Sequence, residues 1–330
     1  MTSRTRYFLI GTLLVLVASL GVGLVAYYRG VPGGLARSAG PAELRYVPAD
    51  ATVVAYANVH DVMNSRFRQQ MLRVEPGEQG RRQFEERTGI DVDHDIDRLV
   101  ACLAPGTGSH QPVGLVLASG RFDQQKIDDL MQKQGAHAET YQGTRILVHD
   151  GAAEGHTLAL AFVQPGLVAV GSLPLVQSAV DLRAGRGANV TSNSELMRLV
   201  RENSQGDAWA VGQFDELRAQ AHLPEGIAKQ IPPITWFSVS GQVDDGLRAT
   251  VRAEARDDQS AQNLRDVVKG FVALARMQSG SRADLQDLVQ SIQMGGTGRD
   301  VSLSFAVPAR MLDRLPQRMG HQPGGGRSPR

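Results

Sequence analysis

Hydrophobic residues run without interruption near the start of the chain and then break into short periodic segments. Residues 7–28 carry no charged side chain. At 1.5 Å per residue, a helix over this segment is about 33 Å long, enough to cross a hydrocarbon core of roughly 30 Å. Aromatic residues stand at both of its ends, as is typical of membrane interfaces. The pattern predicts a single transmembrane helix over residues 7–28.

A cleaved signal peptide is the alternative interpretation of this segment. Its apolar region is expected to be about 7 to 15 residues long and to end at a small-residue cleavage site. Here the apolar run is longer, and no cysteine follows it for lipoprotein processing. We therefore favour an uncleaved signal anchor. Arginines flank both ends, so the positive-inside rule does not decide the orientation. We place the body on the extracytoplasmic, periplasmic side because a large domain behind a short N-terminal stub typically uses such a helix for export.

Beyond residue 45, short segments with the period of β-strands recur along the chain. Residues 51–59 are almost continuously apolar, which predicts an interior strand. Residues 234–243 and 247–255 flank Asp244-Asp245-Gly246, a tight-turn signal that predicts a hairpin. Alternating apolar residues predict a half-buried strand over residues 301–307. Further short strands are predicted over residues 113–119, 144–148, 157–163 and 167–171.

Helices are predicted between these strands from their start signals and apolar faces. Asp123 can cap a helix that carries Ile127. Ser192 and Glu195 have the spacing of a capping box ahead of another helix. The longest helix begins at Asp258, and we expect its apolar face to lie in the core. That face consists of Leu264, Val267, Val268, Phe271, Leu274 and Ala275.

Two stretches of the body resemble one another in the order of their predicted elements. The strands that begin near Asp50 and Asp207 both end at an acidic segment, and the segments after Gly120 and Ala255 both lead from a strand into a capped helix. This order suggests a duplicated α+β unit. The expected fold class is therefore α+β, with a single N-terminal transmembrane helix followed by mostly antiparallel sheet that has helices packed on one side.

The expected organisation follows from these segments. Residues 29–45 are rich in Gly and Pro and predict a flexible tether, and residues 316–330 predict a disordered tail. The complete division is a cytoplasmic stub (1–6), the transmembrane anchor (7–28), the tether (29–45), a first α+β unit (46–190), a second α+β unit (191–315) and the tail (316–330).

The amino-acid composition argues against several kinds of function and site. The 35 basic and 34 acidic side chains leave a net charge of +1, which provides no electrostatic basis for binding nucleic acid. Cys102 is the only cysteine, so an intramolecular disulfide and a cysteine-based zinc site are both impossible. Its apolar surroundings predict a buried thiol. The chain shows no G-x-S-x-G, H-E-x-x-H or phosphate-loop motif, so we expect no catalytic residues, no cofactor and no enzyme.

The acidic segment around residue 93 is the nearest approach to a metal site. Asp91, Asp93 and Asp95 match the first three ligands of an EF-hand loop. The sixth position is Ile96 where the loop needs Gly, and the twelfth is Cys102 where it needs Glu. These aspartates are therefore weak candidates. The alternative is a polar loop whose aspartates accept hydrogen bonds from backbone N–H groups.

Two tryptophans are the candidate ligand-binding residues. Trp209 and Trp236 lie on predicted strands of the second half. They are suited to a concave surface for an apolar or sugar ligand. Tryptophans on strands more often fill a core, which is the alternative interpretation.

Three short segments resemble a family of bacterial membrane-anchored extracytoplasmic proteins with a domain of unknown function. They are Thr88-Gly89-Ile90-Asp91, Asp95-Ile96-Asp97-Arg98-Leu99-Val100 and Gly120-Arg121-Phe122-Asp123. The similarity extends over residues 48–315. It implies the same architecture and adds no catalytic residue.

Three hypotheses about function follow from the sequence. The first is a membrane-anchored extracytoplasmic protein that binds or scaffolds an unidentified envelope protein, with the lipid bilayer as the partner of residues 7–28. The second is a carrier or sensor of a small apolar ligand held between sheet and helices. The third is an enzyme whose residues converge only in three dimensions. An internal apolar cavity would favour the carrier, and a filled core with an exposed apolar patch would favour the scaffold.

Overall fold

The computed structural model describes residues 40–66, 88–106, 113–150, 157–215, 232–279 and 283–308, together with Arg68, Arg82, Glu85 and Glu86. The predicted stub and anchor, residues 29–39 of the predicted tether and the predicted tail lie outside the described residues. Among the helices within those ranges, none combines the length and the apolar composition that a membrane span needs.

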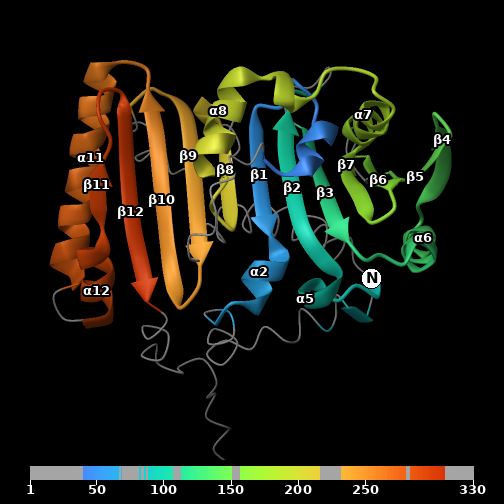
Figure 1. Cartoon of the computed structure of the whole chain (residues 1–330), viewed down its shortest axis with the longest axis horizontal. Helices are drawn as coiled ribbons and strands as arrows, with labels where there is room; N and C mark the ends of the chain where they lie inside the picture. Colours follow the sequence, from blue (N-terminus) through green and yellow to red (C-terminus); the bar gives the residue numbers. More distant parts are fainter. Residues whose placement is uncertain are drawn as a thin grey trace, which may run out of the picture.

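In the described part of the chain, twelve strands form one antiparallel sheet (Figure 1). Their order across the sheet is β11-β12-β10-β9-β8-β1-β2-β3-β7-β6-β5-β4. The strands are β1 (Val53–Asn58), β2 (Ile96–Ala104), β3 (Val113–Gly120), β4 (His137–Tyr141), β5 (Thr144–His149), β6 (Leu158–Gln164), β7 (Leu167–Ser172), β8 (Ala208–Gln213), β9 (Ile234–Val243), β10 (Gly246–Ala255), β11 (Gln293–Gly295) and β12 (Asp300–Pro308).

Short helices connect and cover these strands. They are η1 (Ala42–Tyr46), α2 (Val59–Asn64), α5 (Val92–Asp95), α6 (Gln124–Lys133), α7 (Leu173–Arg183), η2 (Val190–Ser192), α8 (Ser194–Asn203), α11 (Asp258–Gln278) and α12 (Ala283–Ser291). At 21 residues, α11 is the longest of them.

One face of the sheet, here the first face, is covered by η1, α7 and α8. Its core contains Val54 of β1, Leu115 of β3 and Trp209 of β8, packed against Val176 of α7 and Val200 of α8. Each of these side chains is at most 1% exposed. This side of the sheet is therefore a filled interior in the region that these helices cover.

The opposite face, here the second face, is covered at its two ends by other helices. Ile127 of α6 packs against Leu147 of β5 in a cluster near one edge. At the other end, Leu264 of α11 packs against Ala255 of β10 and Val301 of β12. Figure 1 shows α11 running alongside β11 and β12 at the left-hand edge of the sheet.

The predicted α+β fold class is wrong, because the described residues form mostly one antiparallel sheet of twelve strands with few helices. Two details of the prediction also fail. The two predicted α+β units share one continuous sheet, because β1 pairs with β8 from Val53↔Gly212 to Ala57↔Ala208. Helices also lie on both faces of the sheet rather than on one. The physical reason lies in strands such as β1, where the adjacent residues Val53 and Val54 point to opposite faces and are both buried. A strand that is apolar on both faces needs cover on both.

The two halves of the sheet nevertheless follow the same strand order from their shared seam. On one side the order is β8-β9-β10-β12-β11, and on the other it begins with the equivalent β1-β2-β3-β7-β6 and continues with β5 and β4. In each half a capped helix follows the third strand: Asp123 accepts a hydrogen bond from Lys126 N–H before α6, and Asp257 accepts one from Ser260 N–H before α11. This order agrees with the internal duplication that the sequence suggests, which stays a prediction.

The end of the predicted tether is ordered. Residues 42–45, predicted to be flexible, belong to η1, and Leu44 is only 1% exposed. An ion pair holds this segment to β2, since Arg98 Nη2 lies 3.0 Å from Glu43 Oε1. The prediction failed here because a Gly- and Pro-rich composition does not reveal a single apolar side chain that fills a core.

The N-cap of α8 is Asn193, one residue later than the predicted cap Ser192. The Asn193 side chain accepts a hydrogen bond from Leu196 N–H at 3.1 Å, whereas the Ser192 hydroxyl donates to the Asn189 carbonyl at 2.8 Å. Ser192 is therefore part of η2, and the predicted capping box with Glu195 is wrong. The asparagine is as good an N-cap as serine, so spacing alone could not separate the two.

Candidate interaction surface

Helix α11 is built in two parts that differ in what their apolar side chains contact. In its first half, Ala261 is fully buried and Leu264 is 8% exposed, both in a cluster with Ile234, Ala255 and Val301. This half anchors the helix to the second face of the sheet. The cap at Asp257 satisfies the Ser260 N–H at 2.7 Å and sets where the helix begins.

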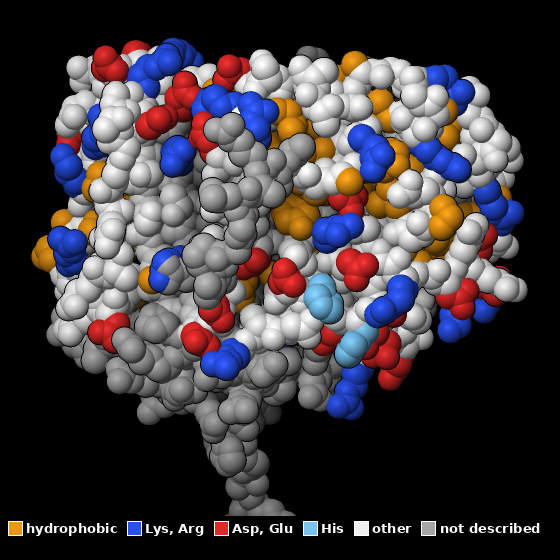
Figure 2. Space-filling model, in the orientation of Figure 1, with side chains coloured by type: hydrophobic (Ala, Val, Ile, Leu, Met, Phe, Trp, Pro, Cys, Tyr) orange, Lys and Arg blue, Asp and Glu red, His pale blue; other side chains and the backbone are white. Residues whose placement is uncertain are grey.

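The second half of α11 exposes large hydrophobic side chains. Phe271 is 50% exposed, Leu274 is 54% exposed and Met277 is 79% exposed. They follow one another at intervals of three residues, so they lie on one side of the helix and form a ridge, here called the α11 ridge. Figure 2 shows hydrophobic side chains at the left-hand edge of the molecule, where α11 lies in Figure 1. The expectation that Phe271 and Leu274 lie in the core is wrong.

Most of the large hydrophobic side chains that are exposed among the described residues lie on the α11 ridge. Four large hydrophobic residues are exposed in that part of the chain, and three of them are Phe271, Leu274 and Met277. Single exposed apolar residues are normal on a protein surface, but a group on one helix is typical of an interaction site. The ridge is therefore the strongest candidate for a functional surface.

Charged residues of α11 lie away from the ridge. Lys269 and Arg276 are about 140° and 160° around the helix from Leu274, at 100° per residue. Lys269 pairs with Asp266, with Nζ and Oδ1 3.1 Å apart. The ridge thus offers an apolar contact strip, and the charges lie where solvent can reach them.

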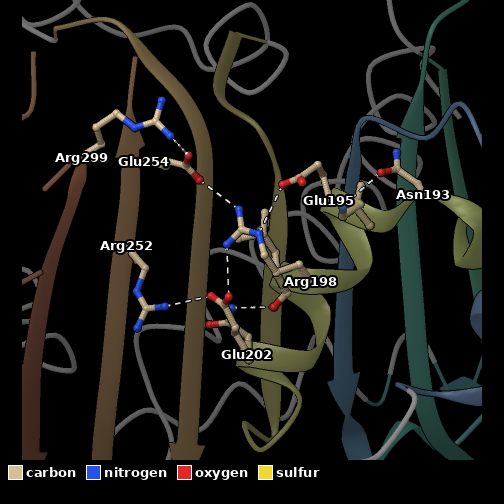
Figure 3. A network of polar contacts seen from close by, with 10 residues as sticks. Asn193, Glu195, Arg198, Glu202, Arg252, Glu254 and Arg299 are labelled. Atoms are coloured by element: carbon tan, nitrogen blue, oxygen red, sulfur yellow. Dashed lines mark hydrogen bonds and ion pairs between the residues drawn. The ribbon is translucent and has the colours of Figure 1, made fainter. Parts of the chain in front are cut away.

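A second polar feature is a network of ion pairs between α8 and β10 on the first face. Figure 3 shows Arg198 reaching from α8 to Glu254 of β10, with a distance of 3.0 Å. The same guanidinium lies 3.3 Å from Glu195 and 3.1 Å from Glu202, and further pairs join Arg252 to Glu202 at 3.0 Å and Arg299 to Glu254 at 3.5 Å. Three arginines and three glutamates balance in charge, so this network fixes α8 to the sheet and presents no net charge to a ligand. Figure 2 likewise shows basic and acidic side chains interspersed over this face.

Carboxylates gather where β8 begins. Asp207 accepts a hydrogen bond from Val243 N–H at 2.6 Å. Burial, together with the nearby carboxylates of Asp61 and Asp244, raises the pKa of Asp207 to about 6. Among the described residues, no group of three or more His, Cys, Asp or Glu side chains is arranged to hold a metal ion. The effect of these carboxylates on one another is therefore electrostatic, and it is seen in the raised pKa of Asp207.

A surface hollow of about 590 Å³ lies at the β9–β10 turn beside α12. Its polar lining consists of Asp244, Asp245, Arg248, Asp287, Gln290 and Ser291. Asp245 also pairs with Arg66 at 3.1 Å. Leu247, Ala306 and Val307 also line the hollow, so its lining is mixed and the hollow is not the enclosed apolar cavity that a carrier needs.

The three aspartates of the predicted acidic loop accept hydrogen bonds from backbone N–H groups around α5 or pair with a nearby arginine. Asp91 is the N-cap of α5 and accepts a hydrogen bond from Asp93 N–H at 2.9 Å. Asp95 accepts one from Asp91 N–H at 2.8 Å. Asp93 lies 3.8 Å from the guanidinium of Arg68. These contacts are those of the alternative interpretation, in which the loop is held by aspartates that bind N–H groups.

The two tryptophans belong to the first-face core, where Trp209 lies opposite Ser240 of β9 and Trp236 lies opposite Gln213 of β8. Trp209 is fully buried beneath α8 and stacks on Tyr56 with ring centroids 5.5 Å apart. Trp236 is partly buried and packs against the same cluster. The structure thus brings the two residues to one region, in an environment of packed side chains.

Cys102 lies in the same core, as predicted. It is 4% exposed, and burial raises the pKa of its thiol to about 12. A thiol in this state is a poor nucleophile at neutral pH.

The sequence contained a signal for the α11 ridge that periodicity alone does not use. From Ala261 to Met277 the apolar residues cover an arc of about 260° around the helix, at 100° per residue. A helix on a sheet buries a stripe little more than about 100° wide, so part of such an arc must remain outside the core. The width of the arc, and not only its presence, would have predicted the exposed side chains.

Comparison with solved structures shows a distant similarity in fold. No protein-family model and no curated protein matches the chain. A solved structure of the protein TP0453 is similar, with 10% sequence identity and a TM-score of 0.44. The alignment covers 82% of this chain and 94% of that chain. Similarity at this level carries no inference about function.

Proposed function

We propose that this protein is a membrane-anchored extracytoplasmic protein that binds or scaffolds another component of the bacterial envelope through the α11 ridge. Residues 7–28 are the proposed anchor, and their partner is the lipid bilayer. No catalytic step is part of the proposal.

The exposed ridge is the observation that carries this proposal. Keeping the apolar surface of side chains such as Phe271 and Leu274 in water costs about 25 cal/mol of free energy for each Å². Both are about half exposed although the same helix buries Leu264 well. A partner that covers the ridge removes this cost, which is why exposed apolar groups of this kind are typical of binding surfaces.

The length of the chain before the body limits where the partner can be. Residues 29–39 connect the proposed anchor to Gly40, the first described residue. Eleven residues span at most about 40 Å when fully extended. The body therefore stays close to the bilayer, and its partner is in the membrane, on its surface or tethered to it.

The carrier hypothesis gains no support from the geometry of the described residues. Trp209 and Trp236 pack in the first-face core, and the hollow beside α12 lies at the surface with a mixed polar and apolar lining. We therefore retain the binding or scaffolding function alone.

The test compares assemblies extracted from native membranes with a mild detergent. In the ridge variant, Phe271, Leu274 and Met277 are all replaced by Ser. In the control, Gln262 and Ala273, which are exposed on another side of α11, are replaced by Ser. We expect the wild type and the control to migrate as an assembly larger than one chain, and the ridge variant to migrate as a single chain with an unchanged melting temperature. An unchanged assembly in the ridge variant would overturn the proposal.

A further inference from the structure

Two residues of the α11 ridge, Leu274 and Met277, belong to a stripe that has the same spacing in both directions. Val267, Gly270, Leu274 and Met277 are separated by three, four and three residues. This is the spacing of the positions at which two helices meet in a coiled-coil seam. Because the intervals are symmetric about residue 272, an antiparallel copy of the helix presents the same stripe in matching register.

Gly270 lies in the middle of this stripe, and the chain's own fold does not require it. A Cβ atom built at Gly270 meets nothing within 4 Å. Glycine within a helix is less favourable than alanine by about 1 kcal/mol. Steric conflict inside the chain therefore does not explain a glycine here. An open notch beside the large side chains of Leu274 and Phe271 does have a use if another helix approaches closely.

The register about residue 272 places large residues opposite the small one. In an antiparallel pair of α11 helices, Leu274 of each copy lies over Gly270 of the other, and Val267 lies opposite Met277. Each notch is filled by a side chain that is 54% exposed in the single chain. A two-fold axis between the copies makes the contact self-complementary and closed.

We propose that the partner of the α11 ridge is a second copy of this chain, joined through an antiparallel α11–α11 contact in which Leu274 of each copy packs into the notch at Gly270 of the other. This inference rests on the proposed function of the ridge and names its partner.

The positions of the charged side chains on α11 and the proposed anchoring in a membrane both agree with such a pair. Lys269 and Arg276 lie on the far side of the helix from Leu274, so two copies meet along the ridge without bringing these cations together. The contact covers about 15 Å of helix, which buries less than the roughly 800 Å² per partner of a typical stable interface. Anchoring in one membrane compensates for the small area, since it raises the effective concentration of one copy around another.

The test uses disulfide formation between two differently tagged copies of the full-length chain in their membrane. One copy carries Gly270→Cys and the other carries Leu274→Cys. Cys102 is 4% exposed and adds little background. A matched pair, Lys269→Cys with Ala273→Cys, has the same spacing on another side of the helix. On mild oxidation we expect the Gly270→Cys and Leu274→Cys copies to form a mixed dimer at least ten times more abundant than that of the matched pair.

A second variant tests the notch without introducing a thiol. Gly270→Leu fills the notch, and the open space around Gly270 means that the single chain accommodates the larger side chain. We expect the dimer to be lost while the melting temperature is equal to or above that of the wild type. Lys269→Leu places a leucine on the far side of the helix, about 140° from Leu274, and should keep the dimer.

Two outcomes would overturn this inference. One is a mixed dimer no more abundant than that of the matched pair, and the other is a Gly270→Leu variant that remains dimeric. If the triple-serine ridge variant still dissociates a larger assembly in these cases, the proposed function stands with a different partner. If Gly270→Leu instead increases retention on vesicles that contain anionic lipid, the ridge contacts the lipid surface and the second copy is excluded.

Discussion

Asp207 shows how the fold changes the chemistry of a single residue. Its carboxylate is partly buried at the start of β8, near Asp61 and Asp244. The native pKa of about 6 lies above the ordinary value of 3.8. Between these values the native state binds more protons than the unfolded state, so stability falls as the pH rises through this range. The contribution of Asp207 is fully favourable below about pH 4 and is lost above about pH 6.

Asp207→Asn is expected to stabilise the protein at pH 8 and to have little effect at pH 4. The amide oxygen can still accept the hydrogen bond from Val243 N–H, and the variant carries no charge near Asp61 and Asp244. Thermal unfolding between pH 4 and pH 8 provides the measurement. The difference in melting temperature between variant and wild type should grow from pH 4 to pH 6 and then level off. A difference that is constant across the range would contradict the assigned pKa.

At the scale of elements, Arg198 joins α8 to the sheet through three glutamates. We expect Arg198→Met to lower the free energy of unfolding by about 1 kcal/mol at low salt, because the partly exposed pairs with Glu195, Glu202 and Glu254 are lost. The loss should become smaller as salt screens the same pairs in the wild type. Urea unfolding at two salt concentrations measures both effects. Arg201→Met on the same helix is the control, and an equal loss in both variants would assign the effect to the helix rather than to the network.

Most strands and the best helices were predictable because their signals are local. The predicted hairpin over residues 234–243 and 247–255 matches β9 and β10 within one residue, and Asp123 caps α6 as expected. Strand β4 was not predicted, since most of its side chains are exposed and it lacks an alternating apolar pattern. The exposed side of α11 was also not predicted, because apolar periodicity does not distinguish a stripe that faces the sheet from one that faces a partner.

At the scale of the whole molecule, the seam between β1 and β8 makes the two halves one structure. Its formation joins residues 53–57 to residues 208–212, far apart in the chain. Local patterns cannot predict this pairing, since an interior strand that is apolar on both faces fits many neighbours equally well. This is why the sequence indicated two units where the structure has one sheet.

The body is therefore expected to unfold in a single transition. Trp209 and Trp236 lie in the second half, and Trp209 stacks on Tyr56 across the seam, so tryptophan fluorescence reports the second half and the seam, while circular dichroism reports strands of both halves. The two signals should change at the same temperature. Gly212→Ala should lower that temperature for both signals together, because a Cβ there would lie 2.5 Å from the Thr52 carbonyl oxygen at the seam. Two separate transitions, with fluorescence following only one, would show that the halves are independent.

The account as a whole rests on a body outside the cytoplasm whose α11 ridge is covered in the native membrane. Labelling of single engineered cysteines in intact cells, made permeable only in the outer layer of the envelope, tests both parts with a membrane-impermeant maleimide. Leu274→Cys lies on the ridge, and Lys269→Cys lies on the far side of the same helix with a similar exposure of 59%. We predict rapid labelling of Lys269→Cys and slow labelling of Leu274→Cys until detergent separates the assembly. Equal rates before detergent would show an uncovered ridge, and labelling of neither before cell lysis would place the body in the cytoplasm.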